Sequence, residues 1–312
     1  MKSNYRYIVK AFMAMAVIAG TTSCDDFLDR EPMSSISPET YYSTAAQLEA
    51  NLNDEYPNVL PSFGQWTYGI FGEDKGTDNQ IEVNANDRYT QDRWKVPHSE
   101  SDNWKFERIY RINFFLSEAL PKFGEDMSGS QNTISGSVAT IKHYIGEMYF
   151  LRAYEYFKKL QLFGDFPIIN QPLADEMEAL REASKRFPRN EVARFIISDL
   201  DKAYAYMSDV DMATTRINKD VAMLVKSRVA LFEATWLQNF KGTAFVPGGE
   251  GWPGASLHNN YQYPSGNIDN EVKYFLEQAV EASKLVADKY KGSLTENTGV
   301  LQQSADDNTK GV

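Results

Sequence analysis

The feature that most constrains this sequence is a helical spacing of apolar residues that recurs in six segments. In each segment apolar side chains return every three or four positions, which places them on one face of an α-helix. Segment 138–163 is apolar on nearly all sides and therefore predicts a buried helix. The six predicted helices span residues 44–56, 102–120, 138–163, 190–207, 219–236 and 270–290.

Helix ends are also marked in the sequence. Pro121 is expected to close the second helix, and Gly164, with Pro167 just beyond it, is expected to end the third. Asn190 is a suitable N-cap for the fourth helix. Few stretches alternate as strands do, and "GDFPII" (164–169) is at most a short extended piece.

The fold class predicted from these segments is mostly α. Pairing 102–120 with 138–163, and 190–207 with 219–236, predicts stacked antiparallel hairpins of the tetratricopeptide type, joined by long loops. The connections vary in length and the repeat consensus is absent, so an irregular helical domain is the alternative. With 42% hydrophobic and 13% aromatic residues the chain has the material for a large core in one large or two small domains.

The first 23 residues have the organisation of a secretory signal. Lys2, Arg6 and Lys10 form a positive region ahead of the apolar run 11–20. That run is shorter than the roughly 20 residues that a membrane span needs. Residues 1–23 are therefore predicted to be a signal peptide.

Cys24 follows this segment and is the only cysteine of the chain, so it forms no internal disulfide. Small residues precede it directly. The stretch resembles a bacterial lipoprotein signal, in which the cysteine becomes the first mature residue and carries acyl chains. Lipidation at Cys24 is the prediction, and an unmodified cysteine is the alternative.

The net charge argues against some classes of partner. Removing residues 1–23 takes away three basic residues and no acid, which moves the formal charge from −11 to −14. Such a surface repels nucleic acid and anionic lipid. A neutral carbohydrate or a protein suits the chain better than DNA.

Motifs of catalysis are weak. His98, His143 and His258 lie far apart without a zinc-binding pattern, and His143, within an apolar helix, is predicted to be a core histidine. The sequence has no G-x-S-x-G and no phosphate-binding loop. Two carboxylates suffice for a glycosidase, and counting acids does not exclude that. No enzyme and no cofactor are expected; calcium stays open, although no EF-hand pattern is present.

Four blocks of sequence carry a resemblance to a known family. They are "CDDFLDREP", "GEMYFLRAYEYFKKLQLFGDFPIINQPL" (146–173), "RNEVARFIISDLDKAYAYM" and "RINKDVAMLVKSRVALFEATW". In this order they resemble the SusD/RagB family. The resemblance implies an outer-membrane, cell-surface lipoprotein with a tetratricopeptide-like scaffold. It further implies binding of oligosaccharide or polysaccharide and a role as the lid of a SusC-like TonB-dependent transporter.

The resemblance covers residues 24–290, which are predicted to form the scaffold. Members of the family are markedly longer, and their C-terminal region packs on the helices and supplies part of the glycan site. This chain stops in a polar run, and 291–312 is expected to be a tail without the family's C-terminal region. We therefore expect a fragment or truncated product with one apolar helical face uncovered.

Two loops combine what a sugar requires, namely aromatic faces for its C–H groups and polar partners for its hydroxyls. They are 64–104 and 240–263. The family places much of its glycan contact in the equivalent of the first loop, so that loop is favoured. Trp94 is the predicted stacking platform, with a core position as its alternative. The other predicted glycan-binding residues are Asp74, Asn79, Arg88, Tyr89 and, in the second loop, Trp252.

The alternatives to a glycan-binding lid are a protein-interaction scaffold and a lid for another class of nutrient. A scaffold would use concave helical faces, whereas a glycan binder needs aromatic and amide-rich loops on one side.

Overall fold

The computed structural model describes residues 41–61, 103–124, 126–208 and 215–293. All helices within these residues belong to one unit, Tyr42–Val312. The helices are α4 (Ala45–Val59), α5 (Glu107–Phe123), α6 (Val138–Phe163), α7 (Met177–Ala183), α8 (Arg189–Tyr206), α9 (Lys219–Asn239) and α10 (Ile268–Tyr290). Within this part of the chain the extended structure is limited to two isolated bridges, Thr44 with Ser135 and Phe166 with Phe187. The prediction of a mostly α fold is confirmed.

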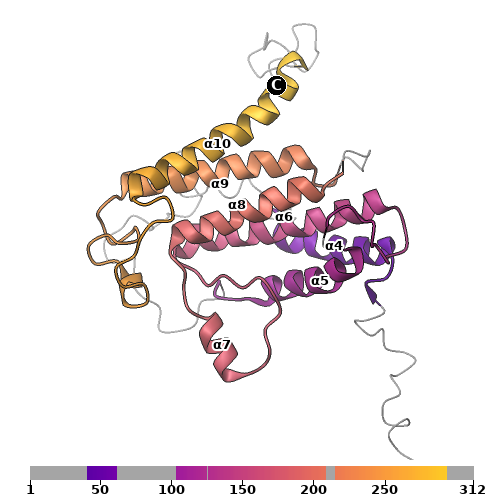
Figure 1. Cartoon of the computed structure of the whole chain (residues 1–312), viewed down its shortest axis with the longest axis horizontal. Helices are drawn as coiled ribbons and strands as arrows, with labels where there is room; N and C mark the ends of the chain where they lie inside the picture. The colour runs from indigo at the N-terminus through magenta and orange to yellow at the C-terminus, as the bar shows by residue number, and fades with distance from the viewer. Residues whose placement is uncertain (1–40, 62–102, 125, 209–214, 294–312) are drawn as a thin grey trace, which may run out of the picture. The chain divides into compact units, whose positions relative to one another are not determined.

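Successive long helices pack on one another, α5 on α6, α6 on α8, α8 on α9 and α9 on α10 (Figure 1). The Arg189 amide, at the start of α8, donates to Asp165 just past the end of α6 at 2.9 Å. At the opposite ends, the Ser208 amide donates to His143 at 3.2 Å. Helices α6 and α8 are therefore antiparallel.

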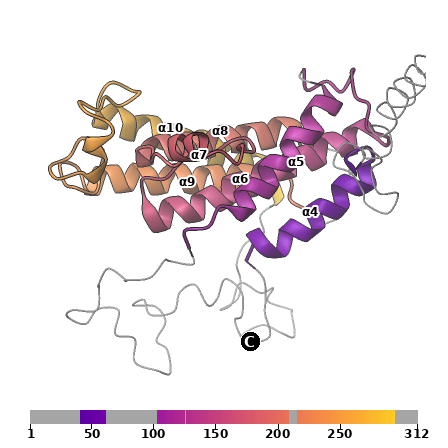
Figure 2. The same ribbon diagram turned by 90° about the horizontal axis from the view of Figure 1, so that it is seen from below.

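The same alternation continues through α10. Arg189 at the start of α8 pairs with Glu233 near the end of α9, and Lys289 near the end of α10 pairs with Asp220 at the start of α9. The predicted stack of antiparallel hairpins is confirmed, including both predicted pairings. Helix α4 also packs on α6. The short α7 forms part of the connection between α6 and α8 (Figures 1 and 2).

Helix α6 lies at the centre of the stack. Ser137 caps its first turn, and Gly164 follows its last residue with φ of +69°. A Cβ on Gly146 would lie 2.8 Å from the Met207 nitrogen and 2.9 Å from the Ala203 oxygen. Because no side chain fits there, glycine allows the end of α8 to approach the α6 backbone closely.

Several predicted helix ends are wrong. Helix α5 begins at Glu107 and not at 102, and α9 continues past 236 to Asn239. Helix α5 runs through Pro121 to Phe123, and α4 passes Pro57 to end at Val59. Phe123 and Val59 are 0% and 2% exposed, so burial of the last turn offsets the hydrogen bond that each proline removes. Helix α8 begins at Arg189, and Asn190 uses its amide to bind Glu271 at 3.0 Å instead of capping the helix.

Buried polar groups tie the connections to the helices. Arg152 of α6 is 3% exposed and donates to both carboxylate oxygens of Asp199 at 2.7 and 2.8 Å. Its Nη1 donates to Asn113 Oδ1 at 2.9 Å and to the Asn170 carbonyl at 3.1 Å. One side chain thus joins α5, α6, α8 and the start of the connection that carries α7.

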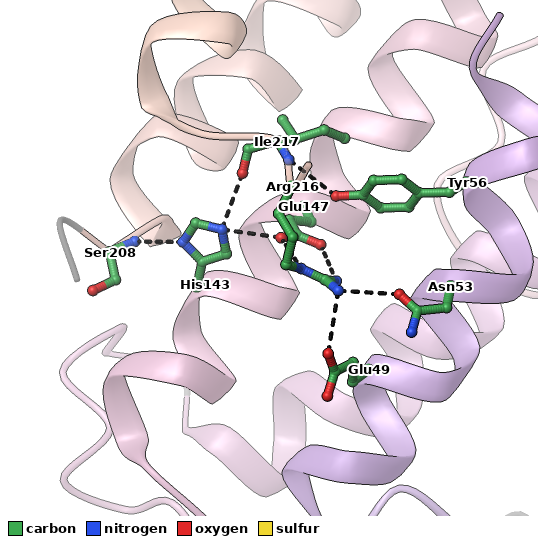
Figure 3. A network of polar contacts seen from close by, with 8 residues as sticks. All are labelled: Glu49, Asn53, Tyr56, His143, Glu147, Ser208, Arg216 and Ile217. Atoms are coloured by element: carbon green, nitrogen blue, oxygen red, sulfur yellow. Dashed lines mark hydrogen bonds and ion pairs between the residues drawn. The ribbon is translucent and has the colours of Figure 1, made fainter. Parts of the chain in front are cut away.

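A second network joins α4, α6 and the segment before α9 (Figure 3). Arg216 forms two hydrogen bonds with Glu147, at 2.6 and 2.8 Å, and a third with Asn53 of α4 at 3.0 Å. The Ile217 amide donates to the Tyr56 hydroxyl at 3.1 Å.

His143 completes this network and is 1% exposed. Its Nδ1 accepts from the Ser208 amide at 3.2 Å, so the ring proton lies on Nε2. Nε2 lies 3.0 Å from the Ile217 carbonyl and 3.0 Å from Glu147 Oε1. His143 is therefore a satisfied core histidine, as predicted.

Candidate functional site

A hollow of about 480 Å³ lies where the ends of three helices meet the connection between α9 and α10. We call this cavity the loop hollow. Residues 240–267 are the α9–α10 loop, which Figure 1 shows at one end of the helices. The walls of the loop hollow come from the end of α6, the segment before α8, the end of α9 and the α9–α10 loop. The lining includes Leu162, Asp165, Arg186, Trp236, Phe245 and Trp252.

The α9–α10 loop is folded on itself by backbone and side-chain contacts. A Cβ on Gly249 would lie 1.9 Å from the Thr243 carbonyl oxygen, so only glycine permits this approach. The Tyr263 hydroxyl donates to the Pro247 carbonyl at 2.6 Å, and the Trp236 indole donates to the Phe245 carbonyl at 3.0 Å. These bonds attach the loop to its own second half and to α9.

Arg189 forms the floor between the helices and the loop. It is 3% exposed, and its Nε and Nη2 atoms donate to the carboxylate of Glu233 at 2.8 to 3.1 Å. Its guanidinium carbon lies 4.1 Å from the centre of the Trp236 ring. Cation and ring therefore stabilise each other, and the ring is fixed at the wall of the hollow.

Asp165 joins α8 to the loop from the other side. One carboxylate oxygen accepts from the Arg189 amide at 2.9 Å and the other from the Trp252 indole at 2.7 Å. Burial raises the pKa of Asp165, and these hydrogen bonds oppose that shift. Trp252 is thereby held against the scaffold.

Exposed apolar side chains from separate segments meet at the rim. Phe245 is 62% exposed, Leu162 55% and Leu257 54%. Arg186 is exposed beside them, with its guanidinium carbon 4.6 Å from the centre of the Trp104 ring. The hollow thus offers apolar faces together with a cationic hydrogen-bond donor.

The structure places one of the predicted glycan-binding residues. Trp252 lines the loop hollow but is only 5% exposed, so it closes the wall and does not stand as an open face. Asp74, Asn79, Arg88, Tyr89 and Trp94, like the predicted anchor Cys24, lie outside the described residues.

Sequence reasoning missed Asp165, Arg186, Arg189, Trp236 and Phe245 as lining residues. Asp165, Arg189 and Trp236 stand in three of the blocks that carry the family resemblance, which was the available signal. Their convergence depends on long-range contacts, such as the one between Arg189 and Glu233, that no local pattern encodes.

Comparison with known proteins places the chain in a family. Residues 26–231 match a family model described as "Starch-binding associating with outer membrane". The chain belongs to the SusD-like family. Carbohydrate binding and association with the outer membrane at the cell surface are properties at the level of this family.

Curated relatives of the SusD-like chain come from Formosa agariphila. SusD-like protein P2 is 25% identical over 253 residues, covering 77% of this chain and 46% of the relative. SusD-like protein P25 is 25% identical over 233 residues, covering 69% and 41%. The chain thus spans less than half the length of these two relatives.

Among solved structures, a SusD-like carbohydrate binding protein from Bacteroides vulgatus ATCC 8482 aligns with a TM-score of 0.46 and 16% identity. That alignment covers 80% of this chain and 45% of that protein.

Among the described residues, no group of three or more histidine, cysteine, aspartate or glutamate side chains is placed to hold a metal ion. None of the helices in that part of the chain combines the length and apolarity that crossing a bilayer requires.

Proposed function

We propose that this protein is a cell-surface lipoprotein that binds oligosaccharide or polysaccharide and delivers it to a SusC-like TonB-dependent transporter, on which it acts as the lid. The observation that supports this most is the family match over residues 26–231. The helical scaffold and an aromatic-lined hollow at one end agree with a binding protein. We propose no catalytic role.

The membrane attachment in this proposal is a lipid on Cys24. Several acyl chains hold a protein on a bilayer much better than one chain does, at about 0.8 kcal/mol per buried methylene. Cys24→Ser should therefore release the mature protein from the membrane fraction. Acyl chains still present on the variant by mass spectrometry would contradict the assignment.

The principal glycan contact in this proposal lies in loop 64–104, with Trp94 as platform and Asp74, Asn79, Arg88 and Tyr89 as its partners. An aromatic platform contributes roughly 1 to 3 kcal/mol, by analogy with base stacking. Trp94→Ala should weaken oligosaccharide binding about tenfold or more, measured by calorimetry on the full-length protein. Unchanged affinity with unchanged helical circular dichroism would remove Trp94 from the site.

Co-purification distinguishes the lid from a free-standing binder. Gentle detergent extraction of the full-length, lipidated protein should retain a TonB-dependent barrel. Glycan binding without a co-purified barrel would support the binding role and contradict the lid role. A protein partner recovered in the absence of any glycan affinity would favour the interaction scaffold.

A further inference from the structure

We propose that the loop hollow is a second carbohydrate subsite, which takes neutral sugar rings. This inference rests on the proposed glycan binding. It specifies where a second contact lies, that the sugar is uncharged, and which further residues touch it. The volume of about 480 Å³ lies within the range of small-ligand pockets.

The apolar part of the subsite is built from exposed side chains. Phe245 is 62% exposed and Leu162 is 55% exposed, although both belong to a hydrophobic class that folding normally buries. They come from the α9–α10 loop and from the end of α6, and converge on the same hollow. Sugar rings present C–H faces that pack on such aromatic and aliphatic surfaces, so Phe245 is the ring contact.

The polar part is carried by Arg186. Its guanidinium is positioned over the Trp104 ring, 4.6 Å from the ring centre. Because this contact already restricts the side chain, Arg186 loses less conformational entropy when a ligand binds. Gln161, also exposed, lines the same hollow. Guanidinium and amide groups both hydrogen-bond to sugar hydroxyls.

Charge balance selects a neutral ligand. Arg189 is neutralised by Glu233, and the lining also holds one further cation, Arg186, and one carboxylate, Asp165. The hollow therefore has no surplus charge, and the chain as a whole carries −11. An anionic sugar would gain little from the hollow and be repelled by the rest of the surface.

The walls are fixed before any ligand arrives. The Trp252 indole is bonded to Asp165, and the Trp236 indole to the Phe245 carbonyl. Two subsites on one chain raise the affinity for a long glycan above that for a short one, because the second contact becomes intramolecular.

The test uses the full-length protein and a glycan array that holds neutral gluco-oligosaccharides, maltoheptaose and laminarihexaose among them, and uronate oligosaccharides. Calorimetry on the best neutral probe follows. Phe245→Ala should weaken binding about tenfold, as loss of one stacked ring does elsewhere, and Arg186→Met should weaken it about threefold, the effect of roughly one hydrogen bond. Tyr110→Ala is the matched control, since Tyr110 of α5 is an aromatic residue 50% exposed and not among the lining residues.

The outcomes separate this inference from the proposed function. Wild-type binding that Phe245→Ala leaves unchanged while Trp94→Ala abolishes it would overturn the second subsite and keep the glycan-binding role. A preference for uronate over neutral probes that Arg186→Met removes would overturn the neutral ligand. Absence of binding to every glycan on the array by the folded wild-type protein would overturn both proposals.

Discussion

Two arginines of this protein, Arg152 and Arg189, are equally buried but differ in the groups that they contact. Each is 3% exposed, and each pairs with a carboxylate that is 0% exposed, Asp199 for the first and Glu233 for the second. The remaining nitrogen of Arg152, Nη1, donates hydrogen bonds to Asn113 Oδ1 and to the carbonyl of Asn170. Both guanidiniums lie beside aromatic rings, but the ring at Arg189, Trp236, lines the loop hollow. The rings at Arg152, Tyr149 and Phe195, do not.

The difference shows that a buried ion pair does not by itself mark a functional site. The Arg152 cluster is packed between helices and a connection, with the half-exposed Lys202 at its edge, and neither Arg152 nor Asp199 lines the loop hollow, so its effect is on stability. The Arg189 cluster ends at an aromatic wall that borders open space, so it also sets the geometry of a binding surface. Removing groups from each region tests this division.

The largest effect is expected at Arg152. Arg152→Met removes the buried cation from Asp199 and leaves only the half-exposed Lys202, 3.8 Å away, beside that carboxylate. This costs about 3 to 5 kcal/mol of unfolding free energy. Urea denaturation followed by circular dichroism measures this loss. The matched control is Lys241→Met, since Lys241 is 51% exposed and pairs with the exposed Asp269.

The exposed control pair should contribute at most about 1 kcal/mol. Equal stability of the Arg152 and Lys241 variants would remove the distinction between a buried cluster and a surface pair. A double variant, Arg152→Met with Asp199→Leu, should recover part of the lost stability, because the buried charge is gone.

A smaller effect is expected at Glu271, which joins α8 to the start of α10. Burial would raise its pKa, but hydrogen bonds from Arg194, Asn190 and Ser265 outweigh burial and lower it. A lowered pKa in the folded state means that the folded protein gains stability above the ordinary glutamate pKa of about 4.3 and loses it as pH falls further.

Glu271→Gln should therefore cost about 1.5 to 3 kcal/mol at pH 7, the range for hydrogen bonds to a charged group. The difference from wild type should shrink as the pH is lowered through and below 4. Urea unfolding at several pH values measures it, and a difference that grows on acidification would contradict the assigned direction.

The smallest effect is expected at Trp252. Trp252→Phe removes the donor to Asp165 and leaves the Arg189 amide bonded to that carboxylate. The cost should be about 1.5 kcal/mol, the lower end of the range for a hydrogen bond to a charged group, because only one such bond is lost. A melting temperature equal to that of wild type would mean that this wall of the hollow is not held by the indole.

The helices were predictable because their apolar spacing is local and repeats over several turns. The ends at Val59 and Phe123 were not, since a proline signals termination while the burial that overrides it is a tertiary property. Asn190 shows the same limit, because its amide bonds to Glu271, 81 positions away. The local sequence pattern therefore indicates helix propensity, whereas tertiary packing determines where the last helical turn ends.

For the candidate site, the sequence indicated the second loop as a place for ring contacts and named Trp252. It could not separate the buried Trp252 from the exposed Phe245, because both are aromatic residues in a glycine-rich loop. The role of Trp94 and its partners in loop 64–104 remains a prediction.

Hydrogen–deuterium exchange with and without a bound neutral glycan tests the division between the two regions most directly. Amides of the α9–α10 loop and of residues 186–189 should gain protection when the glycan is added, while α6 around Arg152 should not change. Protection confined to α6, or its absence from the α9–α10 loop at saturating glycan, would contradict the assignment of binding to the loop hollow.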